Sequence, residues 1–99
     1  MNQFNTKLAP NPHKEKEGSS NLLNNLNQLI QAYPLDPSPY LERAFIHEKK
    51  GNFKDALNDF NESIKLDNKN PLAFLLRGKF HEETGSFNEA IEDYNKALN

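Results

Sequence analysis

The strongest constraint in this sequence is an internal repeat with a period of 34 residues. When residues 37–65 are laid over residues 71–99 without a gap, ten positions are identical. The identical pairs are Pro37/Pro71, Leu41/Leu75, Arg43/Arg77, His47/His81, Glu48/Glu82, Gly51/Gly85, Phe53/Phe87, Ala56/Ala90, Asp59/Asp93 and Asn61/Asn95. Since self-similarity at a fixed period is typical of stacked repeat architectures, the chain is expected to contain two copies of one structural unit.

Each unit is expected to form two α-helices, because its apolar residues recur at three- and four-residue spacings. Helix start and stop signals divide the units into helices from about Pro39 to Lys50, from Phe53 to about Leu66, from Pro71 to Gly85 and from Phe87 onward. The expected N-caps are Asn52, Asn70 and Ser86, the last in a Ser-x-x-Glu capping box. No segment shows a strand signal, so the expected fold class is all-α.

One further helix precedes the two units. Its apolar stripe consists of Leu22, Leu23, Leu26, Leu29, Ile30 and Tyr33. We expect it to begin at Ser19 or Ser20 as N-cap and to stop before Pro34, which cannot continue a helix. Residues 1–19 have only scattered apolar side chains and are expected to be a flexible arm.

The repeated positions resemble the tetratricopeptide repeat, a 34-residue helix–turn–helix unit. Its aromatic, small, aromatic and Ala-x3-aromatic slots are filled by Tyr40, Ala44, His47, Ala56 and Phe60 in the first unit and by Phe74, Gly78, His81, Ala90 and Tyr94 in the second. The resemblance implies an α-α superhelix of antiparallel hairpins, with an orphan second helix over residues 20–36, repeat 1 over 37–70 and repeat 2 over 71–99, without a capping helix.

Three features depart from the family pattern. Arg43 and Arg77 occupy a slot that is usually apolar, and His47 and His81 occupy one that is usually aromatic. Asn68 stands where a proline normally closes the unit. We expect these departures to weaken packing between the helices.

Composition argues against several functional classes. The formal net charge of −2 comes from 12 basic and 14 acidic residues along the chain, so there is no basic stripe for nucleic acid. The sequence has no cysteine, no signal-like apolar run and no stretch approaching the roughly 20 apolar residues of a membrane span. We therefore expect a cytoplasmic protein that binds neither nucleic acid nor membrane.

Catalytic and metal-binding signals are weak. His47 and His81 are each followed by Glu but lack the second histidine of His-Glu-x-x-His, so their expected role is to fill the aromatic slot. No partnered nucleophile motif or glycine-rich phosphate loop is present. The sequence predicts a protein that is not an enzyme and has no catalytic residue, metal site or cofactor.

The resemblance implies a binding surface on the concave side, built by the first helix of each unit. The side chains expected there are Leu41, Phe45, Glu48, Leu72, Leu75, Leu76, Lys79 and Glu83. Some family members bind the terminal carboxylate of chaperone tails through Lys, Asn and Arg, but the comparable positions here are apolar. The expected function is a non-catalytic adaptor or scaffold that binds a peptide or amphipathic helix. The competing interpretation is that Phe45 and Leu75 only complete packing between helices.

A second functional hypothesis concerns the last helix. Terminal repeats need polar outer faces, yet Ile91, Tyr94 and Leu98 are apolar and no further helix follows them in the sequence. This favours self-association through these three residues as a homo-oligomer, or membership of a longer repeat array. A third hypothesis has Phe4 and Leu8 of the N-terminal arm occupying the groove or the end face as an internal ligand.

Overall fold

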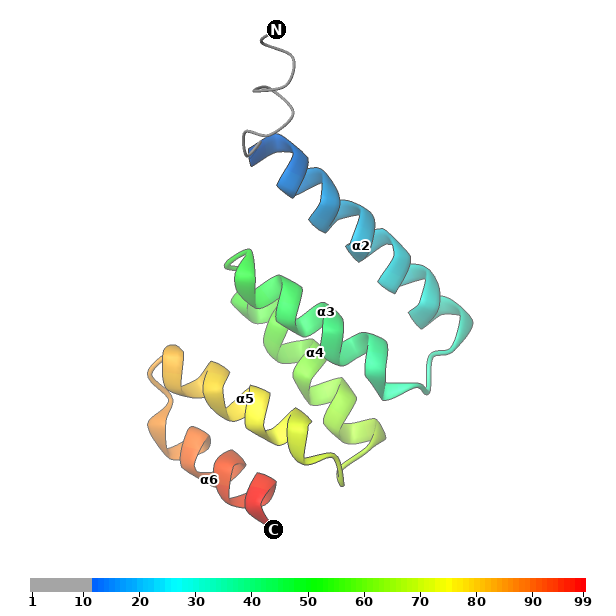
Figure 1. Cartoon of the computed structure of the whole chain (residues 1–99). Helices are drawn as coiled ribbons and strands as arrows, with labels where there is room; N and C mark the ends of the chain where they lie inside the picture. Colours follow the sequence, from blue (N-terminus) through cyan, green and yellow to red (C-terminus); the bar gives the residue numbers. More distant parts are fainter. Residues whose placement is uncertain (1–11) are drawn as a thin grey trace, which may run out of the picture.

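A computed structural model describes the backbone of residues 12–99 and the side chains of residue 18 and residues 20–99. This part of the chain folds into five helices, α2 (Pro12–Ala32), α3 (Pro37–Lys49), α4 (Phe53–Leu66), α5 (Pro71–Glu83) and α6 (Phe87–Leu98), and contains no strand. Helices α3 and α4 form one antiparallel hairpin and α5 and α6 form the next (Figure 1). The all-α prediction is confirmed. Residues 1–11, with Phe4 and Leu8, lie outside the described residues.

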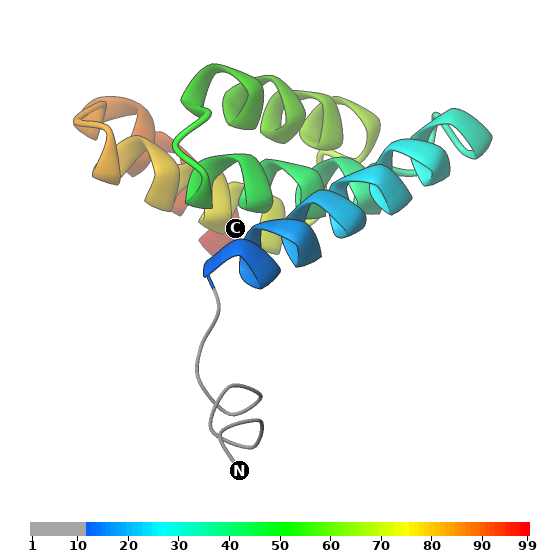
Figure 2. The ribbon, with the colours of Figure 1, turned by 90° about the horizontal axis from the view of Figure 1, so that it is seen from above.

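Helix α3 lies between α2 and α4. It packs closely against α4, its partner in the hairpin, and it also contacts α2 on its other side (Figure 2). The same order continues toward the C-terminus, where α5 lies between α4 and α6. Each first helix of a hairpin is therefore covered by two second helices, one from its own hairpin and one from the preceding unit.

The hydrophobic core runs along the contact between the two hairpins. It consists of Leu41, Ala44, Ala56, Phe60, Ile64, Ala73, Phe74 and Phe80. Small side chains at the centre let the helix axes approach, while the aromatic rings fill the space that remains between neighbouring helices. The small and aromatic positions of the repeat thus produce the close packing between helices that the sequence predicts.

The turns within the two hairpins have the same geometry. Gly51 and Gly85 have φ angles of 82° and 89°, in the left-handed region that glycine adopts without steric cost. The backbone amide of each glycine donates a hydrogen bond to the carbonyl oxygen three residues before it, which belongs to Glu48 in the first turn and to Glu82 in the second. The two glycines therefore end α3 and α5 at the expected places.

The helix caps follow two patterns. Asp36 and Asn70, with ψ angles of 117° and 107°, each accept a hydrogen bond from the amide two residues later, and a proline follows each of them. Asn52 and Ser86, with ψ angles of 72° and 70°, cap only through their backbone carbonyls. Both residues occupy the predicted N-cap position, but neither side chain bonds to a first-turn amide, so the capping box predicted at Ser86 does not form.

Two helices begin earlier than expected. Helix α3 begins at Pro37 rather than near Pro39, because Asp36 caps it and proline is well suited to the first position. Helix α2 begins at Pro12 rather than after Ser19 or Ser20. The Lys and Glu residues that follow Pro12 have high helix propensity, and Gly18 costs only about 1 kcal/mol within the helix.

Gly78 lies where α5 packs tightly against α6. A Cβ at this position would lie 2.8 Å from Cε1 of Tyr94 and 3.2 Å from Cβ of Asp93, whereas one at Gly18 would meet nothing within 4 Å. We expect Gly78→Ala to lower the free energy of unfolding by about 1 to 3 kcal/mol through overpacking. Gly18→Ala should instead raise it by about 0.5 to 1 kcal/mol. Urea titration followed by circular dichroism measures both changes, and stabilisation by Gly78→Ala would contradict the close contact.

Candidate functional site

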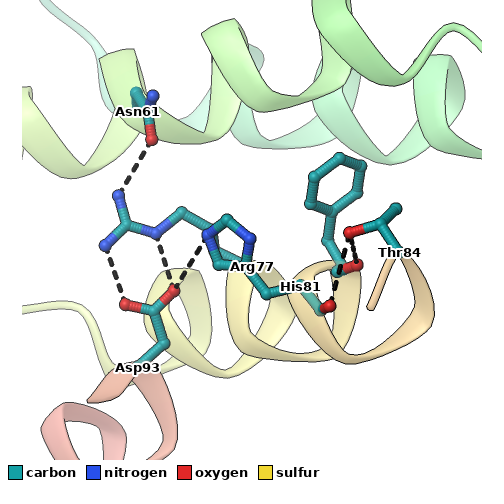
Figure 3. A network of polar contacts seen from close by, with 6 residues as sticks. Asn61, Arg77, His81, Thr84 and Asp93 are labelled. Carbon is teal, nitrogen blue, oxygen red and sulfur yellow. Dashed lines mark hydrogen bonds and ion pairs between the residues drawn. The ribbon is translucent and has the colours of Figure 1, made fainter. Parts of the chain in front are cut away.

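A buried ion pair joins the two helices of the second hairpin. Arg77 of α5 donates from Nε and Nη2 to the two carboxylate oxygens of Asp93 of α6, at 2.8 and 2.7 Å. Its Nη1 donates to Oδ1 of Asn61 on α4 at 2.9 Å (Figure 3). One guanidinium therefore connects three helices through charge-assisted hydrogen bonds, which are stronger than those between neutral groups.

The first hairpin repeats this network at equivalent positions. Arg43 of α3 contacts Asp59 of α4 at 2.7 and 2.8 Å, and its Nη1 donates to Asn27 of α2 at 2.8 Å. The hydrogen bond to Asp59 raises the pKa of Arg43 above its usual value, although burial opposes the shift. These pairs, in which each arginine has a buried carboxylate partner, were not predicted from the sequence.

A histidine lies beside each of these pairs. Nε2 of His47 lies 3.8 Å from Oδ2 of Asp59, and Nε2 of His81 lies 3.8 Å from Oδ2 of Asp93. The His81 ring also packs edge-on against Phe80, with centroids 5.7 Å apart. Among the described residues, no group of three or more acidic or histidine side chains could hold a metal ion. Both histidines thus occupy structural positions beside the ion pairs.

Residues of α2, α3 and α5 line an apolar groove. Its hollow has a volume of about 430 Å³. The residues that line it are Leu22, Ser38, Leu41, Glu42, Phe45, Ile46, Asn70, Leu72 and Leu76. Most of these side chains are aliphatic or aromatic, so the groove favours an apolar ligand surface over a charged one.

Helix geometry explains which side chains reach the groove. Leu41 and Phe45 are four residues apart and lie one above the other on α3, as Leu72 and Leu76 do on α5. Leu41 and Phe45 are each two residues from Arg43, a rotation of about 200° around the helix axis. The ion pair with Asp59 therefore holds one side of α3 against α4 and leaves the opposite side facing the groove.

The structure brings together half of the eight residues expected to bind a peptide. Leu41, Phe45, Leu72 and Leu76 line the hollow, and Leu41 is also part of the core. The other four do not line it: Leu75, Lys79 and Glu83 are exposed on α5, and Glu48 is half-buried on α3. Phe45 and Leu75 are 45% and 48% exposed, so about half of each side chain is not covered by packing between helices.

Two carboxylates lie close to each other on α3 and α5. Burial, followed by a hydrogen bond and charge repulsion from Glu83, raises the pKa of Glu48 above its usual value, and Lys49 and Lys79 partly oppose this shift. Lys49 also lies over the ring of Phe45, with Nζ 5.0 Å from the centroid. A mixed-charge group thus borders the apolar side chains.

The contribution of α2 to the groove was not predicted from the sequence. Leu22 was assigned only to the apolar stripe of the orphan helix, yet it lines the hollow and is 46% exposed. Its place in that apolar stripe was the available signal. Ile46 also lines the groove, four residues after Glu42, but it was not predicted to do so. Its position in the repeat is next to those expected on the concave side.

The three residues predicted for self-association differ in how far they are exposed to solvent. Ile91 and Leu98 are exposed on α6. Tyr94 is half-buried against α5, where its hydroxyl donates to Oε1 of Glu82 at 2.6 Å. This hydrogen bond is the main reason that the pKa of Tyr94 is raised to about 12. The hydroxyl is therefore engaged within its own hairpin, and only the ring is available to a partner.

Comparisons with known proteins agree with this architecture. Residues 37–70 match one family model and residues 72–99 match another, and both are described as tetratricopeptide repeat. Among solved structures, the crystal structure of MamA is similar, with a TM-score of 0.72 at 20% sequence identity. The match covers 77% of this chain and 44% of the MamA chain, and at this identity it concerns the fold alone.

No curated protein matches this sequence. Within the described residues, none of the helices combines the length and the apolar character that crossing a membrane requires.

Proposed function

Since this chain belongs to the tetratricopeptide repeat family, it is a protein-interaction module, and we propose that it binds an amphipathic helix of another protein in the apolar groove. The observation that carries this proposal is the grouping of Leu22, Phe45, Leu72 and Leu76 around one hollow. Three of these are about half exposed although they are large and apolar. Binding involves no chemical step and no cofactor.

The dimensions of the groove suit a helix that inserts one or two apolar side chains. Apolar anchors at i and i+4 of the ligand would fit between α3 and α5, which themselves present apolar residues at this spacing. The hollow of about 430 Å³ can hold a leucine or phenylalanine side chain together with part of its backbone. Burial of the half-exposed groove residues supplies the favourable free energy of binding.

A substitution at the start of α5 tests the proposal without disturbing the fold. Leu72 is 50% exposed and lies in the first turn, where a negative charge is favourable to the helix dipole. The probe is a 16-residue amphipathic helical peptide selected by display against the wild-type protein. We expect Leu72→Asp to weaken its binding by at least about tenfold, because a carboxylate would be desolvated in an apolar contact.

Leu35→Asp is the matched control, because Leu35 is also an exposed leucine but lies in the loop between α2 and α3. Fluorescence anisotropy gives the Kd for each variant, and circular dichroism verifies the helical content. The control should bind like the wild type. Selected peptides that bind Leu72→Asp and Phe45→Asp as tightly as the wild-type protein would contradict groove binding.

A further inference from the structure

The outer face of α4 is the surface against which α5 packs. The ring of Phe80 on α5 lies 6.0 Å from that of Phe53 and 5.6 Å from that of Phe60, measured between centroids. Asn61, which is also on α4, accepts the hydrogen bond from Nη1 of Arg77 at 2.9 Å. Aromatic contacts and one asparagine acceptor thus join the first hairpin to the second.

The outer face of α6 carries the same set of side chains. The pairs separated by 34 residues are Phe53/Phe87, Leu57/Ile91, Phe60/Tyr94, Asn61/Asn95 and Ile64/Leu98, of which two are identical and three are conservative. On α6, however, Phe87, Ile91 and Leu98 are 63%, 57% and 86% exposed. This set, called the α6 outer face below, is a second copy of a helix-binding surface with nothing bound to it in the described residues.

The N-terminal junction shows that the asparagine is a recurring part of the contact. Asn27 of α2, 34 residues before Asn61, accepts from Nη1 of Arg43 at 2.8 Å. At both junctions in the structure, an asparagine of one helix therefore binds an arginine of the next. The helix that follows also presents an apolar residue three positions later, Ile46 in α3 and Phe80 in α5.

The arginines also indicate whether a second copy of this chain could be the partner. The sequence contains only two, Arg43 and Arg77, and both already bind an asparagine and an aspartate within the fold. A second copy could bring one of its arginines to Asn95 only if its own α2 were released or its own core opened. A folded second copy therefore has no arginine available to bind Asn95.

We propose that the α6 outer face binds an amphipathic helix of another polypeptide that carries an arginine three residues before an aromatic or aliphatic side chain. The guanidinium donates to Oδ1 of Asn95, and the apolar side chain lies between Phe87 and Tyr94. A carboxylate of the partner accepts hydrogen bonds from the other guanidinium N–H groups, as the carboxylate of Asp93 does from Arg77. This surface lies on α6, whereas the groove is formed by α2, α3 and α5.

The test uses the full chain and a stapled helical peptide with the sequence of residues 71–83, which presents Arg77 and Phe80 on one face. We expect the peptide to bind, and Asn95→Ala to weaken its Kd by about tenfold, the usual effect of losing a hydrogen bond to a charged group. Arg77→Gln in the peptide should cause a similar loss. Combining both changes should cost little more than either alone, because both remove the same hydrogen bond.

Two control variants of the protein locate the binding site. Asn24→Ala removes the same group from an exposed position of α2, and Phe45→Asp alters the groove. Neither should change the Kd. No binding at millimolar peptide, or a loss of binding with Phe45→Asp, would overturn the proposal. So would a concentration-dependent dimer in sedimentation that Ile91→Glu disperses, because this would assign the surface to a second copy.

Discussion

Replacing Asp93 with alanine is expected to lower the free energy of unfolding by about 3 to 5 kcal/mol, which is the usual cost of removing one partner from a buried ion pair. The side chain of Asp93 is 3% exposed and that of Arg77 is 17% exposed, so the guanidinium would keep its charge with little access to water. A domain of this size has a total stability of about 5 to 10 kcal/mol. The variant should therefore be largely unfolded in moderate urea, as measured by circular dichroism.

Two further variants separate this explanation from a general effect of substitution. Glu92→Ala removes an exposed carboxylate from the same helix and should change the stability by less than about 0.5 kcal/mol. Combining Asp93→Ala with Arg77→Leu removes both charges and should recover much of the loss, since an apolar pair can replace a buried ion pair. If Asp93→Ala cost less than about 1 kcal/mol, the ion pair would not hold the hairpin together.

Replacing Phe60 with alanine is expected to lower the free energy of unfolding by about 3 to 5 kcal/mol. Phe60 is 0% exposed and its ring contacts that of Phe80, so the substitution leaves a cavity between the two hairpins. Phe53→Ala is the matched control, because Phe53 also contacts Phe80 but is 51% exposed. It should cost about 1 kcal/mol.

Urea titration compares the two phenylalanine variants directly. The larger effect at Phe60 follows from its burial between α3, α4 and α5, where the surrounding side chains cannot collapse fully into the space. Equal losses for the two variants would mean that contact with Phe80, rather than burial, determines their contribution. That result would contradict the described position of the core.

The repeat period was sufficient to predict the fold, because the same small and aromatic positions recur in both units. Ala44 and Ala56 lie in the core as the 34-residue register requires. Helix boundaries were less predictable. Local signals compete there: Ser19 and Ser20 are good N-caps, yet the residues after Pro12 extend α2 because they also favour helix.

The polar network was visible in the sequence but was not interpreted correctly. Arg43 and Asp59 each recur 34 residues later as Arg77 and Asp93, and paired recurrence of opposite charges is a signal for contact. Considered one slot at a time, the arginines looked like substitutions that weaken packing. Their partners lie 16 residues away on the adjacent helix, a relation that only the hairpin geometry reveals.

The groove was half predictable for a different reason. Positions on the concave side were predicted from the register, and Leu41, Phe45, Leu72 and Leu76 of that set lie around one hollow. The contribution of Leu22 depends on how α2 crosses α3, and no periodicity in the sequence specifies that crossing.

The most direct measurement of where this protein binds its ligand is a ¹H–¹⁵N chemical-shift titration of the full chain with a selected amphipathic peptide. Binding in the groove predicts that the largest shifts occur at the amides of Leu41, Phe45, Leu72 and Leu76, on α3 and α5. The largest shifts on α4 and α6, with these four amides unchanged, would contradict groove binding.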